Sequence, residues 1–196
     1  MAEASPLLCA GVTTYSPLKK WNVGKGSRVA VVGLGGLGHI AVQFAHALGT
    51  DVTVIGHSES KKNEAAQFGA DNYYVSSPEV FQKLAGQFDF ILNTATVDID
   101  VNAYLNLLRV DGKLVYVGLG AAHQEYSVFS LFAGEKIITA SNVGGVPVTQ
   151  EMLDFAGKHG IKPKIEIIDP SYVPTAYQRV INSDVHYRFV IDISKL

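Results

Sequence analysis

A run of glycines lies between two segments with strong and different periodicities. The first segment, Arg28–Val32, is apolar without alternation after its first residue, which is typical of a strand buried on both faces. The second, Gly36–Leu48, carries apolar residues at helical spacing and is followed by Gly49, a residue type that ends helices. The sequence therefore predicts a strand, a tight turn and a helix in direct succession. The turn consists of Gly33, Leu34, Gly35, Gly36, Leu37 and Gly38.

Each of three glycines in this turn suits a separate role in a dinucleotide site. Gly33 permits the turn out of the strand, Gly35 leaves the backbone open to a pyrophosphate, and Gly38 lets the helix pack closely on the strand. The amide groups and the positive end of the helix dipole then face the phosphates. Two alternatives are a turn that only connects strand and helix, and an S-adenosylmethionine site. The latter expects an acidic residue on the first strand, and Arg28–Val32 has none.

Further valine- and isoleucine-rich runs predict additional buried strands. Helical segments separate these runs, and several of them end at or near a glycine. This alternation predicts an α/β fold with a doubly wound parallel sheet of six strands, the Rossmann arrangement. The predicted strands are Arg28–Val32, Val52–Ile55, Asn72–Val75, Phe88–Leu92, Lys113–Val117 and Lys136–Ala140, and the later helices are Ser60–Phe68, Pro78–Leu84 and Asp100–Arg109.

The two ends of the chain do not follow this alternation. After Gly145 we expect a helix, a strand, a second helix and a last strand, and a sheet separate from the six-stranded one could receive the two strands. The opening residues Ala4–Tyr15 are apolar enough to need burial, yet no partner for them is evident in the sequence. The four C-terminal elements are Thr149–His159, Lys164–Ile168, Val173–Asn182 and Tyr187–Ile193.

Composition narrows the class of partner. With 196 residues, 47% of them hydrophobic, the chain can bury a substantial core. Its net charge is −2 and its charged residues are dispersed, which argues against nucleic-acid or membrane partners and favours small molecules. One cysteine excludes an internal disulfide and fits a reducing compartment, so we expect a cytoplasmic protein. The start shows no basic leader before an apolar stretch, so we expect no secretory signal.

The residues after the second predicted strand indicate which dinucleotide would fit. A site for the unphosphorylated cofactor carries Asp or Glu near the end of this strand, where the carboxylate holds the ribose hydroxyls. This sequence has Gly56 there, followed by Ser58, Lys61 and Lys62. A hydroxyl and two cations suit a 2′-phosphate, so we predict NADP rather than NAD. Glu59 weakens this preference, and a solvated position at the start of a helix is an equal alternative for Lys62.

The chain carries four blocks in a spaced pattern: Ala4–Gly11, Gly33–His39, Thr149–Phe155 and Tyr187–Asp192. Together they closely resemble the cinnamyl-alcohol-dehydrogenase-like branch of the zinc-dependent medium-chain dehydrogenases. Members of that family reduce aldehydes with NADPH or run the reverse reaction. The resemblance implies that Cys9 is one ligand of a catalytic zinc and that Ser58 and Lys61 lie beside the adenosine ribose. It places Thr94, Val117, Gly118, Ser141, Asn142 and Val143 near the nicotinamide half.

The sequence also departs from the family. Members begin with a catalytic domain that holds the other zinc ligands and a proton relay, and this sequence contains no such region. The resemblance therefore implies a truncated enzyme, with a remnant of the catalytic domain and a linking helix in residues 1–20. An NADP-binding Rossmann domain would follow in 21–160, and a segment returning to the catalytic domain in 161–196. Cys9 by itself would hold zinc too weakly, because catalytic sites use three protein ligands.

Other candidate residues have simpler interpretations. The six histidines show no metal-ligand spacing with one another or with Cys9. For His39, at the start of the helix after the glycines, we predict a packing or surface role over a phosphate contact. For Asp98 and Asp100, which lie just before a predicted helix, we predict capping over a catalytic pair of acids.

The resemblance finally implies a mechanism and an assembly. Zinc would polarise the carbonyl of the substrate in the full-length enzyme, while this chain fixes the nicotinamide, binding NADPH with little or no turnover by itself. A non-catalytic dinucleotide-sensing module and a zinc-free quinone-reductase-like enzyme are the alternatives. Family members commonly pair through the edge of the Rossmann sheet, so we expect a homodimer through Ile137–Val143.

Overall fold

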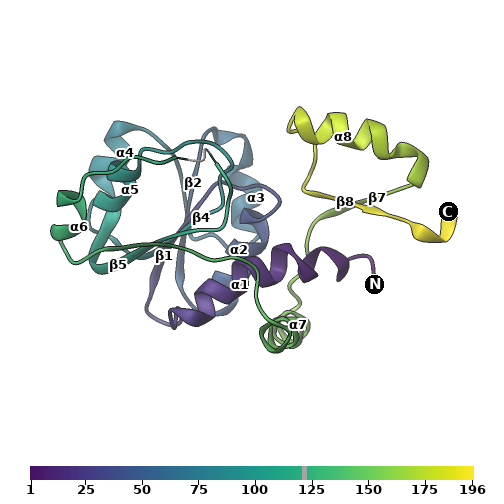
Figure 1. Ribbon diagram of the computed structural model, residues 1–196, viewed down its shortest axis with the longest axis horizontal. Coiled ribbons are helices and arrows are strands. Elements are labelled where there is room, and N and C mark those ends of the chain that lie inside the picture. The colour runs from purple at the N-terminus through teal and green to yellow at the C-terminus, as the bar shows by residue number, and fades with distance from the viewer. Residues whose placement is uncertain (121–122) are drawn as a thin grey trace.

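The computed structural model describes residues 1–120 and 123–196 and contains a six-stranded parallel sheet and a separate two-stranded sheet (Figure 1). The large sheet has the order β3-β2-β1-β4-β5-β6, which confirms the predicted doubly wound arrangement. Strand β1 lies near its centre, and β6 forms one edge. The strands are β1 Arg28–Val32, β2 Asp51–Gly56, β3 Asn72–Val75, β4 Phe88–Asn93, β5 Leu108–Tyr116 and β6 Ile137–Ala140.

Helices cover both faces of this sheet and enclose two apolar cores. Along β1, Val29 and Val31 point into the core beneath α2, while Ala30 and Val32 point into the core on the opposite face. This explains why the strand is apolar at consecutive positions, since each face needs its own apolar set. The helices around the large sheet are α1 Ala10–Lys20, α2 Gly38–Ala47, α3 Lys62–Gln67, α4 Pro78–Lys83, α5 Val101–Leu107, α6 Phe129–Phe132 and α7 Val146–His159.

The opening segment packs against other helices of this chain. Helix α1 packs against α2 and α7, and Val12, Tyr15 and Leu18 on it are buried. The Tyr15 hydroxyl donates a hydrogen bond of 2.9 Å to Glu151 on α7. The expectation that Ala4–Tyr15 lacks a partner within the chain is therefore wrong. Its partner is distant in sequence, and the periodicity of the opening segment holds no information about α7.

Several boundaries differ from the predicted ones. Helix α7 begins at Val146, three residues before the predicted Thr149, because Pro147 fits the first turn of a helix, where its missing N–H is not needed. Strand β5 begins at Leu108, inside the segment predicted to be helical. Helix α6 was not predicted, since its four residues are too few to show a periodicity.

The C-terminal residues form a smaller unit beside the large sheet, drawn in yellow in Figure 1. Within the described residues its two strands pair only with each other, which confirms that they lie outside the six-stranded sheet. Gln43 on α2 joins the two units, because its amide donates to the Lys162 carbonyl at 3.0 Å and accepts from the Lys162 amide at 3.2 Å. The elements are β7 Ile165–Ile168, α8 Val173–Ile181 and β8 Arg188–Ile191, and short 3-10 helices occur at Ser5–Leu8, Glu59–Lys61, Pro170–Tyr172 and Ile193–Lys195.

Among residues 1–120 and 123–196, no helix is both long enough and apolar enough to cross a membrane.

Candidate functional site

The glycine-rich turn connects the carboxyl end of β1 to α2. Gly33 has a φ of +85°, a conformation that side chains disfavour, and its amide donates to the Ile55 carbonyl at 2.9 Å. A Cβ at Gly38 would overlap the Gly33 carbonyl oxygen, so α2 starts directly against the end of the strand. A Cβ at Gly35 would meet no atom within 4 Å. Gly33 and Gly38 thus shape the turn, and Gly35 leaves open space above it.

The open face of the turn presents hydrogen-bond donors. Within the described part of the chain, the amides of Gly35 and Gly36 donate to no protein acceptor. These amides lie just before the N-terminus of α2, a helix of ten residues, where the helix dipole adds a partial positive charge. The arrangement is suited to a phosphate or pyrophosphate group.

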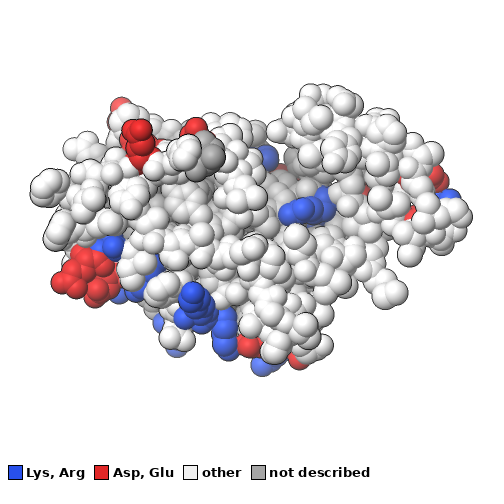
Figure 2. All heavy atoms as spheres, viewed as in Figure 1, with Lys and Arg blue, Asp and Glu red and all other residues white. Residues whose placement is uncertain are grey.

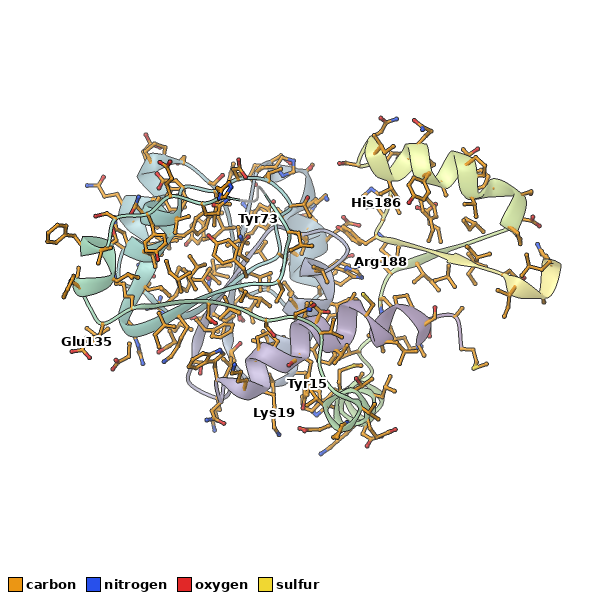
Figure 3. The ribbon with its side chains drawn as sticks, viewed as in Figure 1. Tyr15, Lys19, Tyr73, Glu135, His186 and Arg188 are labelled. Carbon is orange, nitrogen blue, oxygen red and sulfur yellow. The ribbon has the colours of Figure 1, made fainter. Side chains whose placement is uncertain are left out.

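Arg188, the first residue of β8, lies against the same turn. Its Nε donates to the Gly36 carbonyl at 3.1 Å, and burial lowers the pKa of its guanidinium, which still remains cationic. Figure 2 shows a blue side chain in the hollow between the two units, and Figure 3 labels Arg188 at that place. The sequence analysis missed this residue. A single cation at the start of an otherwise apolar strand was the available signal.

The structure brings Lys61 to the turn and leaves Lys62 away from it. The Lys61 ammonium donates to the Leu34 carbonyl at 2.9 Å and lies 5.2 Å from the centre of the Tyr187 ring. Burial lowers the pKa of Lys61, and the Glu64 carboxylate opposes that shift. Lys62 is exposed and pairs with Glu59 at 3.5 Å, which matches the solvated alternative.

Gly56 and Ser58 lie at and just beyond the end of β2. No carboxylate occupies position 56, as the sequence shows, and the hydroxyl of Tyr73 from β3 fills the space of a side chain there. The Ser58 hydroxyl is partly exposed and lies 2.8 Å from that of Ser60, while the Ser58 carbonyl accepts a hydrogen bond of 2.6 Å from Tyr73. Either hydroxyl can be the donor of this pair, so the Ser58 hydroxyl keeps its own proton for a ligand when Ser60 donates.

The residues expected near a nicotinamide lie along the same edge of the sheet. Thr94 follows β4, and its hydroxyl donates to the Val32 carbonyl at 2.8 Å. The amides of Val117 and Gly118, after β5, both donate to the Asn93 carbonyl at 3.0 Å. Because parallel strands end at a common edge, these residues share it with the glycine-rich turn. Ser141, Asn142 and Val143 follow β6 at that edge, with Asn142 and Val143 exposed.

His39 joins the turn to the C-terminal unit. Its Nδ1 lies 2.8 Å from the Gly35 carbonyl, and its Nε2 accepts a hydrogen bond of 3.2 Å from the Lys164 amide. These contacts require the neutral ring with its proton on Nδ1. The ring also stacks on Tyr187 at 4.7 Å, and burial lowers the pKa of His39 to about 4. The predicted packing role of His39 is confirmed.

The residues around Cys9 do not fit a zinc site. Cys9 is exposed just before α1, and among residues 1–120 and 123–196 no three His, Cys, Asp or Glu side chains are grouped to hold a metal ion. A catalytic zinc needs three protein ligands. The capping role predicted for Asp100 is confirmed, since its carboxylate accepts from the Ala103 amide at 3.1 Å. Among the described residues the N-cap of that helix is Asp100 rather than Asp98, and Asp98 accepts a hydrogen bond of 3.2 Å from Gln124.

Comparison with known proteins adds to this geometry. A family model described as zinc-binding dehydrogenase matches residues 36–158. A protein named "Probable formaldehyde dehydrogenase" from Bacillus subtilis is 60% identical over 197 residues, which cover 100% of this chain and 56% of that protein. An NADP-dependent alcohol dehydrogenase of Mycolicibacterium smegmatis is 55% identical over 194 residues, which cover 98% of this chain and 56% of that protein.

A solved structure supports the same family relationship. A cinnamyl alcohol dehydrogenase from Sorghum bicolor superposes with a TM-score of 0.94 at 42% identity, over 98% of this chain and 56% of that one. The chain thus spans about half the length of the curated relatives it matches. These similarities confirm the resemblance predicted from the four sequence blocks.

Proposed function

The chain belongs to the family of zinc-binding dehydrogenases, and on this premise we propose that it binds NADP(H) at the carboxyl edge of its six-stranded sheet. The observation that carries the proposal is the open space at Gly35, whose chain neighbours Gly36 and Leu34 accept hydrogen bonds from two cationic side chains, Arg188 and Lys61. A pyrophosphate needs donors and positive charge at one place, and this turn supplies both. The curated relative named as NADP-dependent supports the choice of dinucleotide.

Each part of the dinucleotide has a proposed location. The pyrophosphate lies on the amides of Gly35 and Gly36 with the Arg188 guanidinium beside it. The 2′-phosphate of the adenosine ribose lies near Lys61 and Ser58, where no carboxylate opposes it. The nicotinamide lies at the ends of β4, β5 and β6, so that the edge of the sheet fixes the face presented for hydride transfer. The residues proposed there are Thr94, Val117, Gly118, Ser141, Asn142 and Val143.

We propose that the whole protein reduces an aldehyde to an alcohol, or runs the reverse. The dehydrogenase names of both curated relatives favour an enzyme over a dinucleotide-sensing module. The zinc-binding family favours it over a zinc-free quinone-reductase-like enzyme. Among the described residues Cys9 belongs to no group of three ligand side chains, so the residues present do not fit a catalytic zinc. A cytoplasmic location stays a prediction.

Lys61→Ala tests the 2′-phosphate site. Removing the ammonium deletes a charge-assisted interaction that only the phosphorylated cofactor makes. We expect NADPH affinity to fall about 10- to 100-fold and NADH affinity by less than about threefold. Fluorescence titration of each nucleotide against the purified chain measures both constants.

Lys62→Ala is the matched control, because Lys62 is the adjacent lysine and its ammonium pairs with Glu59 in solvent. We expect it to bind NADPH within about twofold of the wild type, since exposed pairs contribute little. Equal losses of NADPH and NADH in Lys61→Ala would contradict the assignment of the 2′-phosphate to Lys61. A wild-type chain that binds neither nucleotide would contradict the proposed function as a whole.

We also propose a homodimer through β6. This strand pairs with β5 on one side only, so its other side presents unpaired backbone groups. The adjacent helix α6 exposes the rings of Phe129 and Phe132, at 83% and 77% of their surface. A two-fold axis at this edge would continue the sheet into a second copy and cover those rings.

Ala140→Pro tests this dimer. The Ser141 amide donates to β5, so by alternation the Ala140 amide faces away from the sheet, and proline removes it. We expect a monomer by analytical ultracentrifugation. Val75→Pro is the matched control at the opposite edge, on β3, where the Ser76 amide donates to β2. The control should stay dimeric, and a monomeric wild type or an unaffected Ala140→Pro variant would refute the interface.

A further inference from the structure

The space beside Gly56 is filled by a side chain from the neighbouring strand. Gly56 is the last residue of β2, where a carboxylate would hold the ribose hydroxyls in a site for an unphosphorylated cofactor. A Cβ built at Gly56 would overlap the Tyr73 hydroxyl oxygen and would lie 2.7 Å from Tyr73 Cζ. The sequence has no acidic residue at position 56, and the packing of Tyr73 leaves no space for one.

Tyr73 is held firmly in this position. It lies on β3, directly beside Val54 of β2, and its ring packs against the core that α2 and α3 cover. Its hydroxyl donates to the Ser58 carbonyl at 2.6 Å, and burial raises its pKa, so the hydroxyl stays a donor at neutral pH. Moving the ring aside would break this hydrogen bond and the packing of the half-buried ring against the core, so the overlap at Gly56 is costly to relieve. Figure 3 labels Tyr73 among the side chains at this end of the sheet.

The same hydrogen bond fixes the loop that follows β2. Ser58 is the residue before the short helix Glu59–Lys61, and its backbone sets where that helix begins. Lys61, at the end of this helix, reaches the Leu34 carbonyl of the glycine-rich turn. The proposed preference for NADP(H) depends on position 56, which has no carboxylate, and on the loop that carries Lys61. Tyr73 contacts both of them.

We propose that Tyr73 determines cofactor specificity: its hydroxyl fills the volume that a ribose-binding carboxylate at position 56 requires, and it holds the loop that presents Lys61. The proposal rests on the proposed NADP(H) site and deepens it. A change of preference toward NADH then needs two substitutions, one at Gly56 and one at Tyr73. Tyr73 acts through these neighbours and makes no contact with reacting atoms.

Affinities of four variants test the proposal. We expect Gly56→Asp to lose about tenfold or more in NADPH affinity and to gain no NADH affinity, because its carboxylate cannot take up the ribose-binding position. Gly56→Asp/Tyr73→Val should bind NADH about tenfold more tightly than Gly56→Asp. Tyr73→Val without the acid should lose NADPH affinity through the released loop. Tyr74→Val is the matched control, since Tyr74 is the next residue of β3 and packs against the opposite core; its NADPH-to-NADH ratio should equal that of the wild type.

Stability of an uncharged variant gives a second test that needs no ligand. Gly56→Ala adds only the Cβ, and overpacking should lower Tm by about 3–10 °C in the wild type. In the Tyr73→Val background the same substitution should lower Tm by less than half as much, because the overlapping hydroxyl and ring are gone. Thermal unfolding by circular dichroism measures all four proteins, and it remains informative if Gly56→Asp fails to fold.

The outcomes distinguish a failure of the proposed role of Tyr73 from a failure of the proposed NADP(H) site. Gly56→Asp alone reaching the NADH affinity of the double variant would overturn the role of Tyr73, as would equal Tm losses for Gly56→Ala in both backgrounds. A wild-type chain that binds neither NADPH nor NADH would instead overturn the proposed function. In that case the Tm measurements would still decide whether Tyr73 closes position 56.

Discussion

Gly38→Ala is expected to lower Tm by about 5–15 °C and to abolish detectable NADPH binding. The added Cβ would overlap the Gly33 carbonyl oxygen and would lie 3.0 Å from the Thr94 hydroxyl. The first of these neighbours is backbone in a left-handed turn, so relief requires moving α2 away from the sheet, at a cost of roughly 2–4 kcal/mol. That movement would also carry the amides at the start of α2 out of place. Thermal unfolding and fluorescence titration measure the two effects.

Gly35→Ala, three residues earlier, separates binding from stability. A Cβ there meets open space, so we expect Tm to stay within about 2 °C of the wild type. The methyl group would project into the volume proposed for the pyrophosphate, and NADPH affinity should fall more than about tenfold. Unchanged NADPH binding by Gly35→Ala would contradict the proposed site. Unchanged Tm of Gly38→Ala would contradict the close packing of α2 on β1.

Acidification is expected to destabilise the chain through His39. The ring is neutral in the folded state until its pKa of about 4, whereas the unfolded chain binds a proton below about 6.5. Between these values the unfolded state holds more protons, so the free energy of unfolding falls as pH decreases. The His39 contribution is fully present above about pH 6.5, and about 2 kcal/mol of it is lost by pH 5, on the order of 3 kcal/mol by pH 4. Urea unfolding at pH 7.5, 6 and 5 measures this loss.

The upper part of this range isolates His39 from the carboxylates. Glu64, Glu151 and Glu166 also have lowered pKa values in the fold, but stability from such groups is lost only as pH falls below their unfolded value near 4.5. His39→Gln should therefore show a flatter decline between pH 6.5 and 5, from a lower starting stability. His46→Gln, an exposed site on the same helix, is the control and should retain the wild-type decline. An equally steep decline in His39→Gln would refute the assignment.

Local patterns predicted most of the large sheet. The valine-rich runs and the glycine-rich turn act through neighbours close in sequence, so β1, the turn and α2 lie within two residues of their predicted places. The predicted boundaries are wrong where a tertiary contact determines the end of an element. Strand β5 extends back to Leu108, which pairs with Phe88 across an irregular register that no periodicity reveals.

The candidate site was predicted unevenly for the same reason. The sequence predicted Gly33, Gly38 and Lys61, because these residues lie in the turn or soon after a predicted strand, at the spacing that a dinucleotide site requires. Arg188 and Tyr73 did not stand out, because their importance comes from pairing with Gly36 and Gly56 on other strands or turns. A basic residue in a short strand and a tyrosine in a half-buried one are common, and only the folded chain distinguishes these two.

The contact of Arg188 with Gly36 joins residues 152 positions apart, so during synthesis the glycine-rich turn forms before Arg188 can reach it. Strands β1 to β6 are complete by Ala140 and α7, the last helix around this sheet, by His159, so the nascent chain can collapse around its sheet before β8 leaves the ribosome. Until that strand emerges, the glycine-rich turn would have its amides and no arginine. Proteolytic removal of the last strand would leave a folded sheet in the same condition, with a weakened hold on any anionic ligand.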